Sequence, residues 1–194
     1  MRNAIIMHGC PEKADYYRAN LPSESNAHWL PWLQKELLVH DIAAVTPEVP
    51  LSYEPRWELW SQELERYELT PETILVGHSA GGGFLLKYLS IHPEIRVGKV
   101  ILVAPWFDPD HTIEEKDFFT FEFDPKVAER TASLKVYRSL DDEETVQRSI
   151  RMIMDNVPGA EMREFPDSYG HFTYDNLGGA AFPELRDELL RSDT

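Results

Sequence analysis

Short runs of apolar residues alternate along this chain with longer segments in which apolar residues recur every three or four positions. Continuous apolar runs predict buried strands, and the longer spacing predicts helices with one apolar face. Strands are expected at residues 3–7, 42–46, 73–76, 99–103, 134–137 and 161–165. Helices are expected at residues 28–40, 55–67, 80–91, 139–156 and 182–191.

This alternation of apolar strands and helices is typical of a parallel sheet that is covered on both faces. We therefore expect an α/β protein, a three-layer sandwich built on a mostly parallel sheet of about six strands. A length of 194 residues and the absence of a Gly/Ser-rich linker favour a single domain that spans residues 1–194. In such folds the active site lies at the carboxyl ends of the strands.

The charge balance narrows the range of partners. Acidic residues number 34 and basic residues 19, so 34 − 19 gives a net charge of −15. A field of this sign repels phosphate backbones and anionic lipids, so we expect no nucleic-acid or membrane partner. Cys10 is the only cysteine, which excludes an intrachain disulfide and a cysteine-based zinc cluster. The sequence also lacks a signal-peptide pattern and an apolar run of about 20 residues, so we expect a cytoplasmic protein.

A serine flanked by glycines follows the third expected strand. Residues 77–81 read Gly-His-Ser-Ala-Gly and match G-x-S-x-G at a strand-to-helix junction, the pattern of a nucleophile elbow. The helix that follows would point its first N–H groups toward the site and stabilise developing negative charge. The spacing fits neither a Walker-type phosphate loop nor a dinucleotide fingerprint. Ser79 is therefore the predicted nucleophile, while the reason for Gly82 and Gly83 stays open.

A serine nucleophile needs a histidine base, which follows the serine and the acid in chain order in this context. Three histidines lie well beyond Ser79, at His92, His111 and His171. His92 falls at the far end of the helix that leaves the serine, and His111 comes before the later strands. His171 follows the sixth strand in a loop rich in turn residues, so we predict that it is the base.

The acid should follow the fifth strand, where Asp141 and Asp142 are adjacent. Both residues also suit the start of a helix, so the pattern does not separate them. Asp108 and Asp110, after the fourth strand, are weaker alternatives.

Two backbone N–H groups should bind the oxyanion of the tetrahedral intermediate. We expect one from Ala80, directly after the nucleophile, and the other from Cys10 in the loop after the first strand. Pro11 has no N–H and is excluded from this role. Candidates for pocket lining are His8, His78, Trp106 and Phe107. No metal or cofactor is expected.

With the serine, the acid and the histidine in this chain order, the sequence resembles a serine hydrolase of the α/β-hydrolase fold. More narrowly, it resembles the compact group typified by retinoblastoma-binding protein nine. The narrower resemblance is carried by HWLPWL at residues 28–33, GHSAG at 77–81, VILV at 100–103, Asp141-Asp142 and Gly170-His171-Phe172. It favours Asp142 as the triad acid, with Asp141 as the alternative, while the 25 residues at 106–130 are too few for a large cap domain. The loop at residues 10–27 is longer than in that group, which we expect to reshape the pocket entrance.

The human member of the group is linked to the retinoblastoma protein through an L-x-C-x-E motif. Here His8 stands where that motif requires leucine, so no such partner is expected.

Residues 106–130 carry six aromatic side chains among many acids and lie where α/β-hydrolases insert lids. We expect a short aromatic flap over the serine, and the alternative is that these rings complete the core. Taken together, the sequence predicts a hydrolase that cleaves a small acyl ester or related acyl substrate through an acyl-enzyme intermediate. The alternative function is a binding or regulatory protein that keeps the fold with weak catalysis.

Overall fold

The computed structural model describes residues 2–113 and 117–191. Six parallel strands form one sheet in the order β2-β1-β3-β4-β5-β6. The strands are β1 (Asn3–Met7), β2 (Ala43–Val45), β3 (Ile74–His78), β4 (Val97–Val103), β5 (Thr131–Ser139) and β6 (Glu161–Phe165). The predicted fold class is confirmed, because the sheet is parallel, helices cover both faces and no large cap is present among the described residues.

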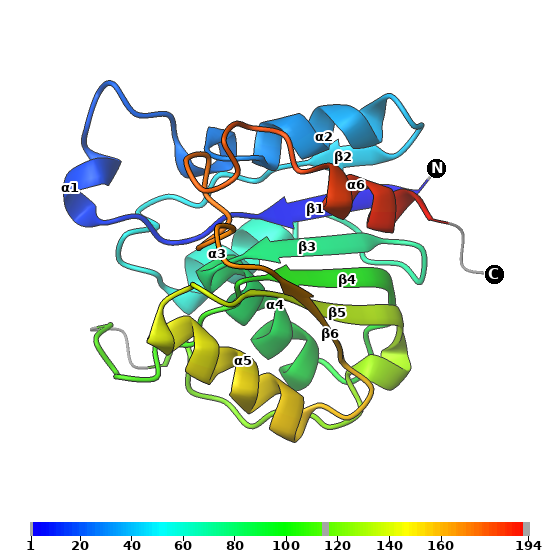
Figure 1. Cartoon of the computed structure of the whole chain (residues 1–194). Coiled ribbons are helices and arrows are strands. Elements are labelled where there is room, and N and C mark those ends of the chain that lie inside the picture. The colour runs from blue at the N-terminus through cyan, green and yellow to red at the C-terminus, as the bar shows by residue number, and fades with distance from the viewer. Residues whose placement is uncertain (1, 114–116, 192–194) are drawn as a thin grey trace.

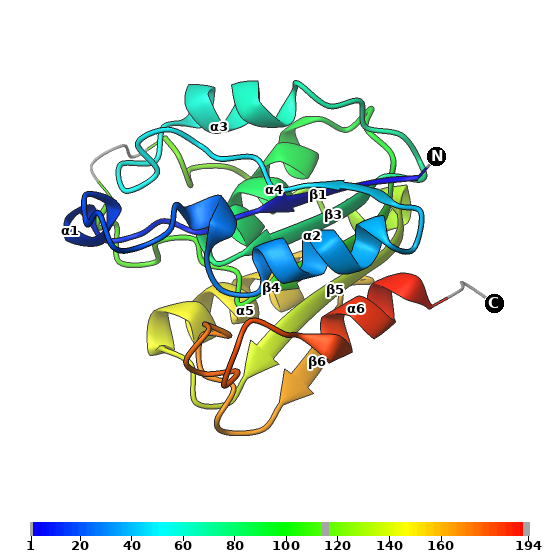
Figure 2. The same cartoon turned by 90° about the horizontal axis from the view of Figure 1, so that it is seen from above.

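The helices lie in two layers, with α2 and α6 on one face of the sheet and α3, α4 and α5 on the other (Figures 1 and 2). The α-helices are α1 (Lys13–Tyr16), α2 (Leu30–Leu38), α3 (Trp57–Leu64), α4 (Ala80–Ile91), α5 (Glu144–Asn156) and α6 (Pro183–Leu190), and short 3-10 helices span Glu24–Asn26 and Ala128–Arg130. The helix predicted from residue 139 begins at Glu144, because β5 continues through Ser139. No helix in the described part of the chain is long and apolar enough to cross a membrane.

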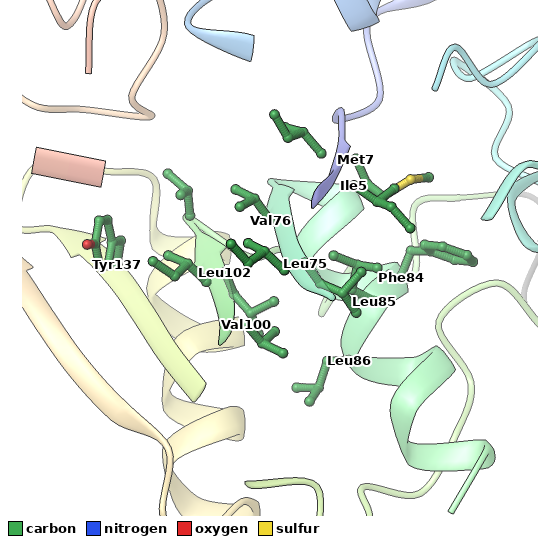
Figure 3. Close-up of a cluster of buried hydrophobic side chains, with 14 of the residues drawn as sticks. Ile5, Met7, Leu75, Val76, Phe84, Leu85, Leu86, Val100, Leu102 and Tyr137 are labelled. Carbon is green, nitrogen blue, oxygen red and sulfur yellow. The ribbon is translucent and has the colours of Figure 1, made fainter. Parts of the chain in front are cut away.

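The core is centred on β3, β4 and α4. Every residue of β3 and β4 is buried, which explains why these two strands read as continuous apolar runs. Figure 3 shows side chains of β1, β3, β4 and β5 in one cluster with Phe84, Leu85 and Leu86 of α4. Burying one such side chain contributes about 1.5–3 kcal/mol, so this cluster fixes the position of the turn between β3 and α4.

The carboxyl ends of the strands share one edge of the molecule, at the left of Figure 1. The loop that leaves β1 and carries α1 lies at this edge, as does the loop that follows β6. The N-terminus and the end of α6 lie at the opposite edge. The arrangement brings segments far apart in the sequence together beyond the tip of β3.

Of the aromatic residues of segment 106–130, two are buried in the core and the other four pack against it partly buried, and none of the six lines the cavity of Ser79. Phe118 is fully buried, with its ring 5.3 Å from the ring of Trp60. Phe107 is also buried and its ring lies within 6.0 Å of three others, those of Phe119, Phe121 and Phe123. The aromatic flap is therefore not what the structure shows, because the rings gain more by burial than they would at the pocket mouth. Residues 114–116 of this segment lie outside the described residues.

Candidate active site

Ser79 occupies a strained turn between β3 and α4. Its backbone has φ 53° and ψ −122°, a conformation that costs a non-glycine residue about 1–3 kcal/mol. Its N–H donates to the carbonyl of Val103 at 2.9 Å, and its own carbonyl accepts from the N–H groups of Gly82, Gly83 and Trp106 at 2.9, 3.2 and 3.1 Å. These four bonds tie the strained residue to β4, to α4 and to the loop after β4.

Close backbone approach explains the run of glycines around the serine. A Cβ at position 77 would lie 2.6 Å from Gly82 Cα, and one at position 81 would overlap the carbonyl oxygen of His8. A Cβ at position 83 would overlap the carbonyl oxygen of Trp106. Gly83, which the sequence left unexplained, therefore lets α4 pack against the loop that follows β4.

The structure brings His171 and Asp142 together from different loops. Nδ1 of His171 lies 3.0 and 3.1 Å from the two carboxylate oxygens of Asp142. The Asp142 side chain is only 1% exposed, whereas that of His171 is 30% exposed. A carboxylate accepts hydrogen bonds, so Nδ1 carries the proton and the lone pair of a neutral imidazole is on Nε2. This is the tautomer that a general base requires.

Asp141 holds the loop that carries the histidine. It accepts hydrogen bonds from Ser139 Oγ at 2.5 Å, from Ser168 N at 2.8 Å and from Gly170 N at 2.9 Å. The hydrogen bond from Ser139, followed by the one from Ser168, holds the pKa of Asp141 below its ordinary value. The two adjacent aspartates therefore act on different parts of one loop, Asp142 on the imidazole and Asp141 on the backbone.

The two weaker acid candidates are engaged elsewhere. Asp108 accepts hydrogen bonds from Thr112 and from the N–H of Ile113, all at 2.7–2.8 Å. Asp110 forms an ion pair with Arg148 at 2.8 Å. The structure brings neither of them to His171.

Ser79 and His171 line one cavity of about 630 Å³ at the strand ends. Its other lining residues are Gly9, Cys10, Pro11, Asp15, Leu21, Pro22, Glu24, Asn26, Ala27, His28, Pro31, His78, Tyr174 and Ala180. Within the described part of the chain, no hydrogen bond joins Ser79 Oγ to His171. Catalytic hydrogen bonds are often long or poorly aligned in active sites without substrate. The predicted longer loop at residues 10–27 thus supplies much of the cavity wall.

Of the two predicted oxyanion donors, Cys10 lines the cavity of Ser79 and Ala80 directly follows Ser79 in the chain. The backbone N–H groups of Cys10 and Ala80 donate to no other protein atom within the described residues. Ala80 is the first residue of α4, where N–H groups lack a helical partner. Gly9 keeps the loop close, since a Cβ there would lie 3.1 Å from Ser79 Cβ. Burial raises the pKa of the Cys10 thiol, so the side chain stays protonated.

Of the two histidines predicted to line the pocket, His78 does so and His8 does not. His78 lines the cavity, and its Nε2–H donates to the carbonyl of His171 at 2.8 Å. Burial, then the nearby His171 and His28, hold the pKa of His78 well below its ordinary value, so the ring is neutral. His8 is not among the lining residues: its Nε2 accepts from Val49 N at 3.0 Å and its Nδ1–H donates to Gly9 O at 2.7 Å.

The aromatic candidates Trp106 and Phe107 also lie outside the cavity of Ser79. Phe107 is buried in the core. Trp106 lines a neighbouring cavity of about 460 Å³, which shares Cys10 and Pro11 with the first. The Gly9–Pro11 loop therefore contributes to the wall of both cavities.

Comparison with known proteins shows the family to which the chain belongs. The sequence profile of the serine hydrolase family matches residues 21–190. YdeN of Bacillus subtilis (strain 168), a provisionally named hydrolase, is 34% identical over 148 residues, which cover 73% of this chain and 72% of YdeN. The crystal structure of the ydeN gene product superposes with a TM-score of 0.74 at 27% identity and covers 97% of both chains.

A more distant structure shows the same fold. Est1E from Butyrivibrio proteoclasticus, solved with ferulic acid bound, gives a TM-score of 0.62 at 11% identity over 97% of this chain and 86% of that one. The chain belongs to the serine hydrolase family, in the α/β-hydrolase fold. Family membership makes it a hydrolase.

Proposed function

We propose that this protein hydrolyses small acyl esters or related acyl compounds with Ser79, His171 and Asp142 as its triad. The single observation that carries the proposal is the His171–Asp142 pair, which faces the same cavity as a serine held in a strained turn. The narrower likeness to the compact group of retinoblastoma-binding protein nine is part of the proposal. The adjacent aspartates support it, because the second of them contacts the histidine.

In the proposed reaction, Nε2 of His171 takes the proton of Ser79 Oγ as the oxygen attacks the substrate carbonyl. Asp142 stabilises the imidazolium that forms. The N–H groups of Cys10 and Ala80 bind the oxyanion, and the positive end of the α4 dipole adds to this stabilisation. His171 then protonates the leaving group, and water repeats the sequence on the acyl-enzyme.

Labelling with a fluorophosphonate probe tests the nucleophile. The wild-type chain should be labelled, Ser79→Ala should not, and Ser133→Ala in β5, far from the cavity, should be labelled like the wild type. Equal labelling of Ser79→Ala would overturn the proposal.

A panel of esters, amides and thioesters should then give turnover that is lost in Ser79→Ala. Labelling of Ser79 without turnover of any of them would favour the alternative, a binding or regulatory protein with weak catalysis.

A further inference from the structure

One wall of the cavity that contains Ser79 carries negatively charged side chains that have no role in the proposed reaction. The loop between β1 and α2 supplies Asp15, Leu21, Glu24 and Asn26 to this wall, together with prolines and Ala27. The wall is largely apolar but holds two carboxylates. Of the described residues that line the cavity, none is Lys or Arg.

Glu24 is the carboxylate that lacks a counter-ion. It is half-buried, and within the described residues its side chain has no hydrogen bond or ion pair, whereas Asp15 pairs with Arg18 at 2.9 Å. Burial, then the neighbouring charges of Glu48 and Asp15, raise the pKa of Glu24 to about 7. Glu48 accepts a hydrogen bond from Ser25 N at 2.9 Å and brings no positive charge to the group. A partly buried carboxylate of this kind is costly until a cation neutralises it.

A second observation also indicates a ligand that donates hydrogen bonds. His78 is only 3% exposed and lines the same cavity. Its Nε2–H is used by the carbonyl of His171, so Nδ1 is left as an acceptor without a protein partner in the described chain. Asn26 uses its Nδ2 to donate to Ser23 and Ser25, which leaves its Oδ1 as a further acceptor. The positive charge of an ammonium group complements the carboxylates of this wall, and a primary ammonium also has N–H donors for the two acceptors.

The position of Glu24 near Cys10 gives a catalytic reason to expect a cationic ligand. Its charge acts on the Cys10 thiol and contributes to the raised pKa of that group. The same charge opposes the negative charge that develops on the substrate oxygen beside Cys10 N. A cation bound at Glu24 would remove this opposition as well as contribute binding energy.

We propose that the cavity accepts acyl substrates that carry a cationic ammonium group a few bonds from the scissile carbonyl, with the Glu24 carboxylate as its counter-ion. This inference rests on the proposed hydrolase function and names the substrate class of the same site.

Two substrate pairs of matched shape test the inference at pH 8. Butyrylcholine and 3,3-dimethylbutyl butyrate place the charge on the alcohol side, and ethyl 6-aminohexanoate and ethyl heptanoate place it on the acyl side. We expect the cationic member of at least one pair to have the larger kcat/KM, by about tenfold. Glu24→Gln should bring that ratio to about one and leave the neutral ester at least as fast.

Glu12→Gln is the matched control, since Glu12 lies on the same loop but lines the neighbouring cavity. It should leave the ratio unchanged. The inference is overturned if neither pair shows a preference, or if Glu24→Gln lowers the rates of both members equally.

A binding measurement separates failure of this inference from failure of the proposed function. Calorimetry of butyrylcholine and of ethyl 6-aminohexanoate with Ser79→Ala, and with the double variant that adds Glu24→Gln, reports on the cation site without turnover. Suppose that removal of Glu24 abolishes binding but fluorophosphonate does not label Ser79 of the wild type. The proposed cation site would then stand, and the proposed hydrolase function would be rejected. If Ser79 is labelled but cationic substrates are not preferred, the proposed hydrolase function would stand and the cation site would be rejected.

Discussion

The strand-end turns and the loop between β1 and α2 both line one cavity and are built in different ways. The turn at Ser79 is fixed by buried strands, backbone hydrogen bonds and glycines that permit no Cβ. The loop at residues 10–27 contains one short helix and one 3-10 turn, and many of its side chains are exposed. Under the proposed function, we expect the first region to set which chemistry is available and the part of the second region beyond Cys10 to set which substrates reach it. Changes in the first should affect all substrates alike, and changes in the second should alter their ratio.

The largest effect is expected at Asp142. Asp142→Asn keeps the shape of the side chain but favours the wrong tautomer of His171, so kcat should fall by about 10³–10⁴-fold on cationic and neutral esters alike. Steady-state kinetics with both members of a matched pair measures this. A fall confined to one substrate would contradict the division between the two regions.

A second test adds a single methyl group to the strand-end turn. Gly81→Ala places a Cβ against the carbonyl oxygens of His8 and Met7, and both belong to backbone that is buried beneath the site. We expect the free energy of unfolding to fall by about 2–4 kcal/mol, measured by chemical denaturation. Ala27→Gly in the β1–α2 loop serves as the comparison and should cost less. Equal losses would mean that the loop is packed as tightly as the turn.

Asp141 should show a smaller effect that acts through the position of His171. Asp141→Asn weakens the hydrogen bonds from Ser168 N and Gly170 N, so kcat should fall by about tenfold with little change in KM. The pH profile of kcat should shift as well, because the imidazole loses its alignment with Asp142. Asp167→Asn, on the exposed surface of the same loop, should match the wild type in both measurements. Unchanged kinetics in Asp141→Asn would show that the loop holds His171 without it.

The smallest effect concerns the stability contribution of Glu24. Its pKa is raised from 4.5 to about 7, so the folded protein binds a proton that the unfolded chain has released. Stability should therefore decrease as the pH rises from about 4.5 to 7 and stay lower above that range. Glu48, Asp15 and the Cys10 thiol face this carboxyl group, and Arg18 is paired with Asp15.

Glu24→Gln removes this penalty. Its free energy of unfolding should match that of the wild type near pH 4 and exceed it at pH 8 by on the order of 1 kcal/mol, given the partial exposure of the group. Denaturation curves at both pH values measure the difference, with Glu12→Gln as the control. Equal curves at pH 8 would contradict an unpaired charge at this wall.

The same two regions differ in how well the sequence predicted them. The strands around Ser79 could be predicted because they are buried on both faces and therefore uniformly apolar, and G-x-S-x-G fixes the geometry of the turn. The choice between Asp141 and Asp142 could not be made from local pattern, since both suit a helix start. Which aspartate contacts His171 depends on how residues 166–171 pack against the end of β5. These are tertiary contacts, which a local sequence pattern does not encode.

Two other features had no usable signal in the sequence. The rings of segment 106–130 could have faced the core or the pocket, because without a helix or strand there is no periodicity to assign a face. The carboxylate of Glu24 lies in a polar stretch typical of an exposed loop, and only the folded chain places it at the cavity wall beside Cys10. Sequence patterns thus predicted the elements and the loop that borders the pocket, but not where the Glu24 carboxylate and the aromatic rings would lie.

Cys10 and Pro11 line both the cavity of Ser79 and the neighbouring cavity of about 460 Å³. We expect this shared wall to limit the length of a bound acyl chain. If the proposed function holds, a smaller side chain at position 11 should join the two spaces and extend hydrolysis toward longer acyl chains, so that substrate length would depend on one proline ring.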